Sequence, residues 1–184
     1  MPFAFPEGLA PEVYPLAWLV GSWRGEGMIE YPGITTTPFV QDVVFDHDGG
    51  PYLRFESTLR VRSSAAADGE ADADASDEPD TVWSTETGYW RMSSDRPDGL
   101  TDDQHAIEVL LTDASGRMSL FLGVVGKGRI DLATDFVART ATAAEVTAAK
   151  RLYGLVEGRL MWVEELAAFG HPLGSYASAQ LDRL

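Results

Sequence analysis

Because the chain contains no cysteine, only histidine, carboxylate, hydroxyl and phenol side chains remain to carry out acid–base or metal chemistry. His47, His105 and His171 lie too far apart to form a local metal-binding motif, and no His-x-x-x-His pair occurs. His47 falls in an Asp- and Gly-rich segment typical of a turn, and His105 follows two aspartates in an expected loop. The sequence therefore predicts no clustered metal site and gives no basis for a Ser-His-Asp triad.

A glycine-rich run with the pattern G-x-W-x-G-x-G contains Gly21, Trp23, Gly25 and Gly27. It lacks the Lys-Ser/Thr pair and the strand-to-helix context of a phosphate-binding loop. Glycine in a strand instead permits sharp bending and close approach of a second backbone, and an indole can fill one end of a barrel. We therefore take these four residues as candidates for shaping a binding pocket.

The charge of the chain narrows the range of partners. A formal net charge of −15, with no Lys/Arg-rich run, argues against binding to nucleic acid or to an anionic membrane. Residues 63–80 hold seven acidic residues and no basic ones, which predicts a disordered, solvated loop, with an acidic interaction patch as the alternative. With no apolar leader and no uninterrupted run of ~18 apolar residues, we expect one cytoplasmic domain spanning residues 1–184.

Alternation of apolar and polar residues is the main structural signal. Between residues 53 and 62 the apolar positions Leu53, Phe55, Leu59 and Val61 alternate with polar ones, which predicts a strand with one wet face. Two more alternating segments flank the turn Gly126-Lys127-Gly128 and predict a hairpin. Their apolar positions are Met118, Leu120, Leu122 and Val124 before the turn, and Ile130, Leu132 and Phe136 after it.

A long run of such strands must either expose its edges or close on itself. Closure removes the edges, so we predict an all-β, closed, antiparallel up-and-down barrel. The clearest helical signal lies between Pro11 and Leu19, where apolar residues recur at helical spacing. We expect a short N-terminal helix there, packed as a plug or lid.

Further short motifs follow the glycine-rich run in a definite order. They are Tyr31-Pro32, F-D-H-D-G-G-P at 45–51, E-T-G-Y at 86–89, E-V-T at 145–147 with Arg151, G-H-P-L at 170–173 and A-Q-L at 179–181. In order and spacing this series resembles the nitrobindin family of fatty-acid-binding-protein-like barrels. The resemblance implies a barrel of roughly ten strands that holds ferric haem b through a C-terminal histidine. It also implies nitric oxide binding or isomerisation of peroxynitrite to nitrate.

The sequence departs from the family at the haem ligand. The family pattern P-L-x-x-H becomes Pro172-Leu173-Gly174-Ser175-Tyr176, which puts the Tyr176 phenol where the imidazole is expected. A phenolate can ligate ferric haem, but a phenol with an ordinary pKa near ~10 must first ionise. The alternative is that Tyr176 is a wall residue whose hydroxyl forms a hydrogen bond. His171 is a weaker substitute ligand, since it lies five residues earlier in an extended segment.

Three more positions differ from the family pattern around the expected cofactor. Gly33 replaces a threonine, Ala144 replaces a lysine that could pair with a propionate, and a histidine found in some members is replaced near Ser84. We therefore expect a barrel that binds a small apolar or amphipathic ligand without catalysis and without stable haem. The rival hypothesis is a ferric haem b protein, with Tyr176 as the iron ligand, that isomerises peroxynitrite or binds nitric oxide.

Overall fold

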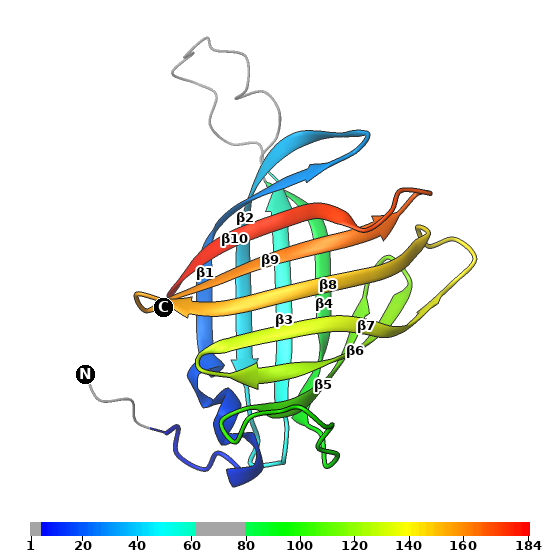
Figure 1. Ribbon diagram of the computed structural model, residues 1–184. Coiled ribbons are helices and arrows are strands. Elements are labelled where there is room, and N and C mark those ends of the chain that lie inside the picture. The colour runs from blue at the N-terminus through cyan, green and yellow to red at the C-terminus, as the bar shows by residue number, and fades with distance from the viewer. Residues whose placement is uncertain (1–4, 62–79) are drawn as a thin grey trace, which may run out of the picture.

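The chain folds into a closed antiparallel barrel in which every strand pairs with its neighbours in sequence and β1 pairs with β10 (Figure 1). The computed structural model describes residues 5–61 and 80–184. The elements are η1 (Pro11–Leu19), β1 (Gly21–Tyr31), β2 (Ile34–Asp46), β3 (Leu53–Val61), β4 (Thr81–Met92), β5 (His105–Asp113), β6 (Arg117–Gly126), β7 (Arg129–Arg139), β8 (Val146–Val156), β9 (Arg159–Ala168) and β10 (Gly174–Arg183). The predicted all-β barrel is confirmed.

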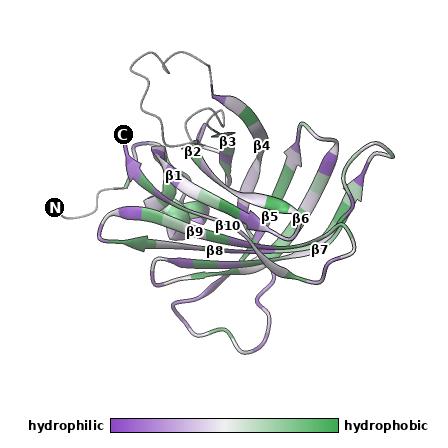
Figure 2. Cartoon of the chain, turned by 90° about the horizontal axis from the view of Figure 1, so that it is seen from above, coloured by the Kyte–Doolittle hydropathy of each residue, from purple (hydrophilic) through white to green (hydrophobic). Residues whose placement is uncertain are grey.

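Strand β3 shows why these segments close around one core. Leu53, Phe55 and Leu59 are buried and Val61 is half-buried, while Arg54 and the other outward residues remain in contact with solvent. The same alternation of hydrophobic and hydrophilic residues is visible along other strands in Figure 2. Because successive side chains of a strand point to opposite faces, closure places one apolar face of each strand in a common interior.

The predicted hairpin around residues 126–128 is confirmed as β6 and β7. Lys127 and Gly128 both have positive φ, at 54° and 70°, as a two-residue type I′ turn requires. The inward face of β6 was predicted wrongly, however. Phe121 and Val125 are buried there, whereas Met118 is 57% exposed on the outside. Both faces of β6 carry apolar residues, so the alternation does not show which face points into the barrel.

A β-bulge explains a second error on β7. Ile130 and Leu132 are buried as expected, but Phe136 is 62% exposed. In the pairing with β6, Thr134 and Phe136 oppose consecutive residues, so Asp135 is the extra residue. An inserted residue reverses the alternation beyond it, and Phe136 consequently faces outward.

The N-terminal segment η1 packs against one end of the barrel as the predicted helix, but it is a 3₁₀ helix. Pro15 lies inside it and has no N–H to donate, which disfavours an α-helix at that point. Trp23 is fully buried beside η1, where its Nε1 donates a hydrogen bond to the Leu19 carbonyl at 2.7 Å. The Arg183 guanidinium lies over the indole ring, 4.1 Å from its centroid. Trp23 therefore fills this end, as predicted.

The glycines beside Trp23 allow adjacent strands to approach closely. A Cβ on Gly25 would lie 2.0 Å from the Gln180 carbonyl oxygen, and one on Gly27 would lie 2.3 Å from that of Ser178. Neither clash can be relieved by moving a side chain, because the obstructing atoms belong to the β10 backbone. The run is therefore needed for closure between β1 and β10.

The acidic loop predicted at 63–80 lies outside the described residues except for Asp80, which is exposed just before β4. Within residues 5–61 and 80–184, no helix has the length and apolar character needed to span a bilayer.

Candidate functional site

A cavity of about 400 Å³ opens at the end of the barrel opposite η1. Its lining comes from β2 and β3, from the first residues of β4 and β10, from β8, from the last residues of β9 and from the turn between β5 and β6. The deeper part of the lining is aromatic and includes Phe55, Tyr153 and Trp162. A volume of this size, inside a barrel, is in the range of small-molecule sites.

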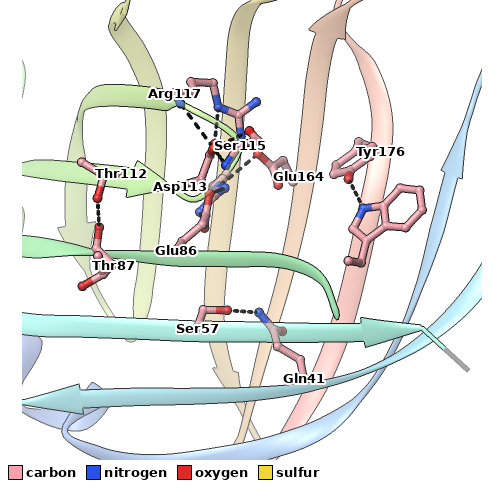
Figure 3. A network of polar contacts seen from close by, with 12 residues as sticks. Gln41, Ser57, Glu86, Thr87, Thr112, Asp113, Ser115, Arg117, Glu164 and Tyr176 are labelled. Atoms are coloured by element: carbon pink, nitrogen blue, oxygen red, sulfur yellow. Dashed lines mark hydrogen bonds and ion pairs between the residues drawn. The ribbon is translucent and has the colours of Figure 1, made fainter. Parts of the chain in front are cut away.

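Nearer the mouth, the same strands carry a buried ion cluster centred on Arg151 of β8, which lies one inward position from Tyr153. Its two terminal nitrogens donate to both carboxylate oxygens of Glu86 on β4, each at 2.7 Å. Its Nε donates to Oε1 of Glu164 on β9 at 3.1 Å. The Arg151 and Glu164 side chains are each only 7% exposed. Figure 3 shows Glu164 between Glu86 and Tyr176 in the barrel interior.

The two carboxylates of this cluster respond differently to their surroundings. Burial tends to raise the pKa of Glu86, but the bidentate contact with Arg151 outweighs it and lowers the pKa overall. Burial raises the pKa of Glu164, and its weaker contact with Arg151 does not reverse the shift. Glu164 is therefore the group in the cluster that takes up a proton more readily.

This difference predicts the effect of neutralising Glu164. Its pKa is raised in the folded protein above the ordinary value of 4.5, so folded protein binds more protons than unfolded protein above that pH and stability falls as pH rises. Glu164→Gln should remove this loss, raising the free energy of unfolding at pH 8 by about 0.5–3 kcal/mol and having little effect at pH 4. Urea unfolding at both pH values measures this, and a variant less stable than wild type at pH 8 would contradict it.

A hydrogen-bonded chain of neutral groups links the aromatic lining to strands β2 and β3. Trp162 Nε1 donates to Gln41 Oε1, and Gln41 Nε2 donates to Ser57 Oγ, both at 2.8 Å. Because the Ser57 oxygen accepts this bond, its own proton is available to donate. The chain thus fixes the orientation of the indole and offers a hydroxyl at the cavity wall.

Tyr176 and Trp83 meet at the mouth of the cavity. Trp83 Nε1 donates a hydrogen bond to the Tyr176 hydroxyl at 3.0 Å, although the two residues lie on β4 and β10. Both are bulge residues: strand pairing passes from Ser84 to Val82 around Trp83, and from Ser175 to Ala177 around Tyr176. Bulges re-aim side chains that regular alternation would send elsewhere. Paired bulges therefore bring these two rings together.

The Tyr176 phenol is held in its protonated form. Burial raises its pKa above the ordinary value, and the hydrogen bond from Trp83 offsets this only in part. Its ring also packs edge-on against Tyr31, with centroids 5.8 Å apart. These contacts match the prediction of a wall residue with a hydrogen-bonded hydroxyl.

Of the seven other predicted site residues, two line the cavity and five do not. Ser84 and Ala144 line the cavity with Tyr176, at β4 and just before β8. Gly33 lies in the turn between β1 and β2 at φ 81°, next to the lining residue Ile34. The remaining four do not line this cavity but shape the β1 side of the barrel: Gly21, Trp23, Gly25 and Gly27.

None of the three histidines lines the cavity. His171 is exposed in the turn after β9, where its ring meets the edge of Tyr31 at a centroid distance of 6.0 Å. His105 is exposed at the start of β5, and His47 lies in the turn after β2. Among the residues described, no group of three or more His, Asp or Glu side chains is arranged to hold a metal ion.

Sequence reasoning missed the charged cluster. In the sequence, Glu86 and Arg151 stand out only as motif residues, and Glu164 belongs to no motif. One signal was available: Glu164 follows Leu160 and Trp162 at the inward positions of β9, where an apolar residue is expected. A charge in that register predicts a buried partner, although the sequence does not say which one.

Comparison with known proteins agrees with the geometry. A family described as "THAP4-like, heme-binding beta-barrel domain" matches residues 12–183. The chain belongs to this family.

Relatives of this THAP4-like barrel carry two different names. A ferric nitrobindin-like protein from Beutenbergia cavernae is 47% identical, with both chains covered completely. A peroxynitrite isomerase from Clavibacter michiganensis subsp. michiganensis is 34% identical over 97% of this chain and 98% of its own. The crystal structure of Rv2717c from M. tuberculosis superimposes with a TM-score of 0.73 at 31% identity, covering 96% of this chain and 99% of that one. The predicted nitrobindin resemblance is confirmed.

Proposed function

We propose that this THAP4-like barrel is a binding protein for a small amphipathic molecule and that it forms no stable complex with haem. The cavity carries this proposal, since it joins an aromatic wall containing Phe55 and Trp162 to a buried ion cluster around Arg151. Sites for small organic ligands combine these features: a mainly apolar enclosure and a few fixed polar groups that orient the ligand.

The described lining suits haem iron poorly. It contains no histidine, and the phenol of Tyr176 is protonated and already bonded to Trp83. The family's lysine position holds Ala144, and among described lining residues the cations, Arg117 and Arg151, are both paired with carboxylates. Two anionic propionates would find no free cation in this part of the wall.

A ferric haem protein is the second candidate, because relatives named peroxynitrite isomerase are similar over nearly the whole chain. In that case Tyr176 would hold the iron, and the haem would supply Lewis-acid chemistry toward an anionic oxidant. The phenol would first have to lose its proton and its contact with Trp83. Because of this requirement, we favour the binding of a small amphipathic ligand over the binding of haem.

Binding of 1-octanol tests the proposed cavity. We expect the neutral chain to bind wild-type protein, detected by calorimetry and by quenching of tryptophan fluorescence, because Trp162 lines the cavity. Ser84→Phe should weaken binding about tenfold or more by filling the space with a ring. Thr87→Phe introduces the same ring on the exposed face of β4 and should leave binding unchanged. Equal binding by both variants would contradict the proposal.

A further inference from the structure

The cavity wall carries a surplus of negative charge. Its described charged residues are three carboxylates and two guanidiniums. The carboxylates belong to Glu86, Asp113 and Glu164, and the guanidiniums to Arg117 and Arg151. Arg117 pairs with Asp113 at 2.8 Å, and Arg151 serves both glutamates. One negative charge is therefore left without a cation of its own in a region where unpaired charge is costly.

The geometry assigns this surplus to Glu164. All three nitrogens of the Arg151 guanidinium are engaged, and two of them are fixed on Glu86 by the shorter contacts of 2.7 Å. Glu164 receives one bond, at 3.1 Å and at Oε1. A carboxylate has about four acceptor sites, so Glu164 retains capacity for a further donor. Its side chain is 7% exposed and lines the cavity, so such a donor must come from inside the cavity.

The groups around Glu164 suit an organic cation. Trp162 and Tyr153 line the same cavity, with ring centroids 6.5 Å apart, and Phe55 lies in the wall with them. Aromatic faces attract ammonium groups and also pack against alkyl chains. A carboxylate ligand would find no unpaired cation, because both guanidiniums of the described wall are already paired with carboxylates.

We propose that the ligand is an amphipathic amine, whose ammonium group pairs with Glu164 and whose apolar body packs on the aromatic wall. This inference rests on the proposed small-ligand function and names the chemical class of the ligand. The amine would complete the ion cluster by matching Glu86 and Glu164 with two cations, Arg151 and itself. The ion cluster would thereby select amines over neutral and anionic ligands, in addition to stabilising the barrel.

Three probes with the same eight-carbon chain test the assignment: octylamine, 1-octanol and sodium octanoate, titrated calorimetrically into the full chain at pH 8. Octylamine is a cation at this pH and octanoate an anion. We expect octylamine to bind about tenfold or more tightly than octanol, and octanoate to bind most weakly. Glu164→Gln should bring octylamine to within about threefold of octanol, because the amide offers no charge.

Glu165→Gln is the matched control, since Glu165 is the next residue of β9 and is exposed on the outer face. It changes the net charge identically and should preserve the amine preference. Octanol or octanoate binding to wild-type protein as tightly as octylamine would overturn the amine assignment, while Ser84→Phe would still show that a small ligand occupies the cavity. If none of the three probes binds the folded barrel, the proposed binding function itself fails. The wild-type ranking decides the inference independently of the behaviour of Glu164→Gln.

Discussion

Arg151→Met is expected to lower the free energy of unfolding at pH 7 by about 3–5 kcal/mol, as found when one partner is removed from a buried ion pair. Arg151 donates to both oxygens of Glu86 and to Glu164 inside the barrel. Methionine preserves much of the side-chain volume but leaves two buried carboxylates without a cation. Denaturant unfolding at equilibrium measures the loss.

The loss in Arg151→Met should depend on pH. Without the guanidinium, burial raises the pKa of both glutamates above the ordinary 4.5, so folded protein holds more protons and its stability falls as pH rises through and beyond that value. At pH 4 the variant should be much closer to wild type. Arg159→Met is the control, because the Arg159–Asp182 pair is exposed and such pairs contribute little. Equal destabilisation by both substitutions would contradict a buried, functional ion cluster.

Tyr176→His is expected to raise hemin affinity by an order of magnitude or more, because imidazole ligates iron without the ionisation that a phenol requires. The β10 bulge aims position 176 at the cavity, so the new ring should point inward as Tyr176 does. The gain should be partial, since Gly33 and Ala144 still lack the hydroxyl and amine of the family pattern. Titration followed at the Soret band measures it.

Two further variants sharpen the Tyr176→His test. Trp83 Nε1 donates to position 176 and would compete with iron for the imidazole nitrogen, so adding Trp83→Phe should increase affinity again. Ser178→His places an imidazole on the exposed face of the same strand and should leave hemin binding at the wild-type level. If Ser178→His and Tyr176→His bind hemin equally, the iron is held outside the cavity and the assigned pocket is wrong.

The alternation of apolar and polar residues was enough to predict the strands and the closure of the barrel. The inward face of β3 was predicted from Leu53, Phe55 and Leu59, and the hairpin from the turn at Lys127-Gly128. The prediction failed where one inserted residue reversed the alternation, as at Asp135 before Phe136. Bulges arise from the pairing of two strands, so a single strand read alone does not reveal them.

The candidate site was predictable only in part, for the same reason. Family motifs drew attention to Tyr176 and Ser84, both of which line the cavity. The contact between Trp83 and Tyr176 spans 93 residues and depends on two bulges, and the contact between Arg151 and Glu86 spans 65 residues. Such contacts are consequences of barrel closure. The chemistry of the cavity therefore became visible only once the strands were placed around it.

Hemin titration of the purified wild-type protein, followed at the Soret band, tests the central claim most directly. We expect only weak, non-saturating changes, and an identical titration for Tyr176→Phe, because the Tyr176 phenol is protonated and bonded to Trp83. Tight, saturable binding of hemin by wild-type protein that Tyr176→Phe abolishes would contradict the account and establish the phenolate-ligated haem protein in its place.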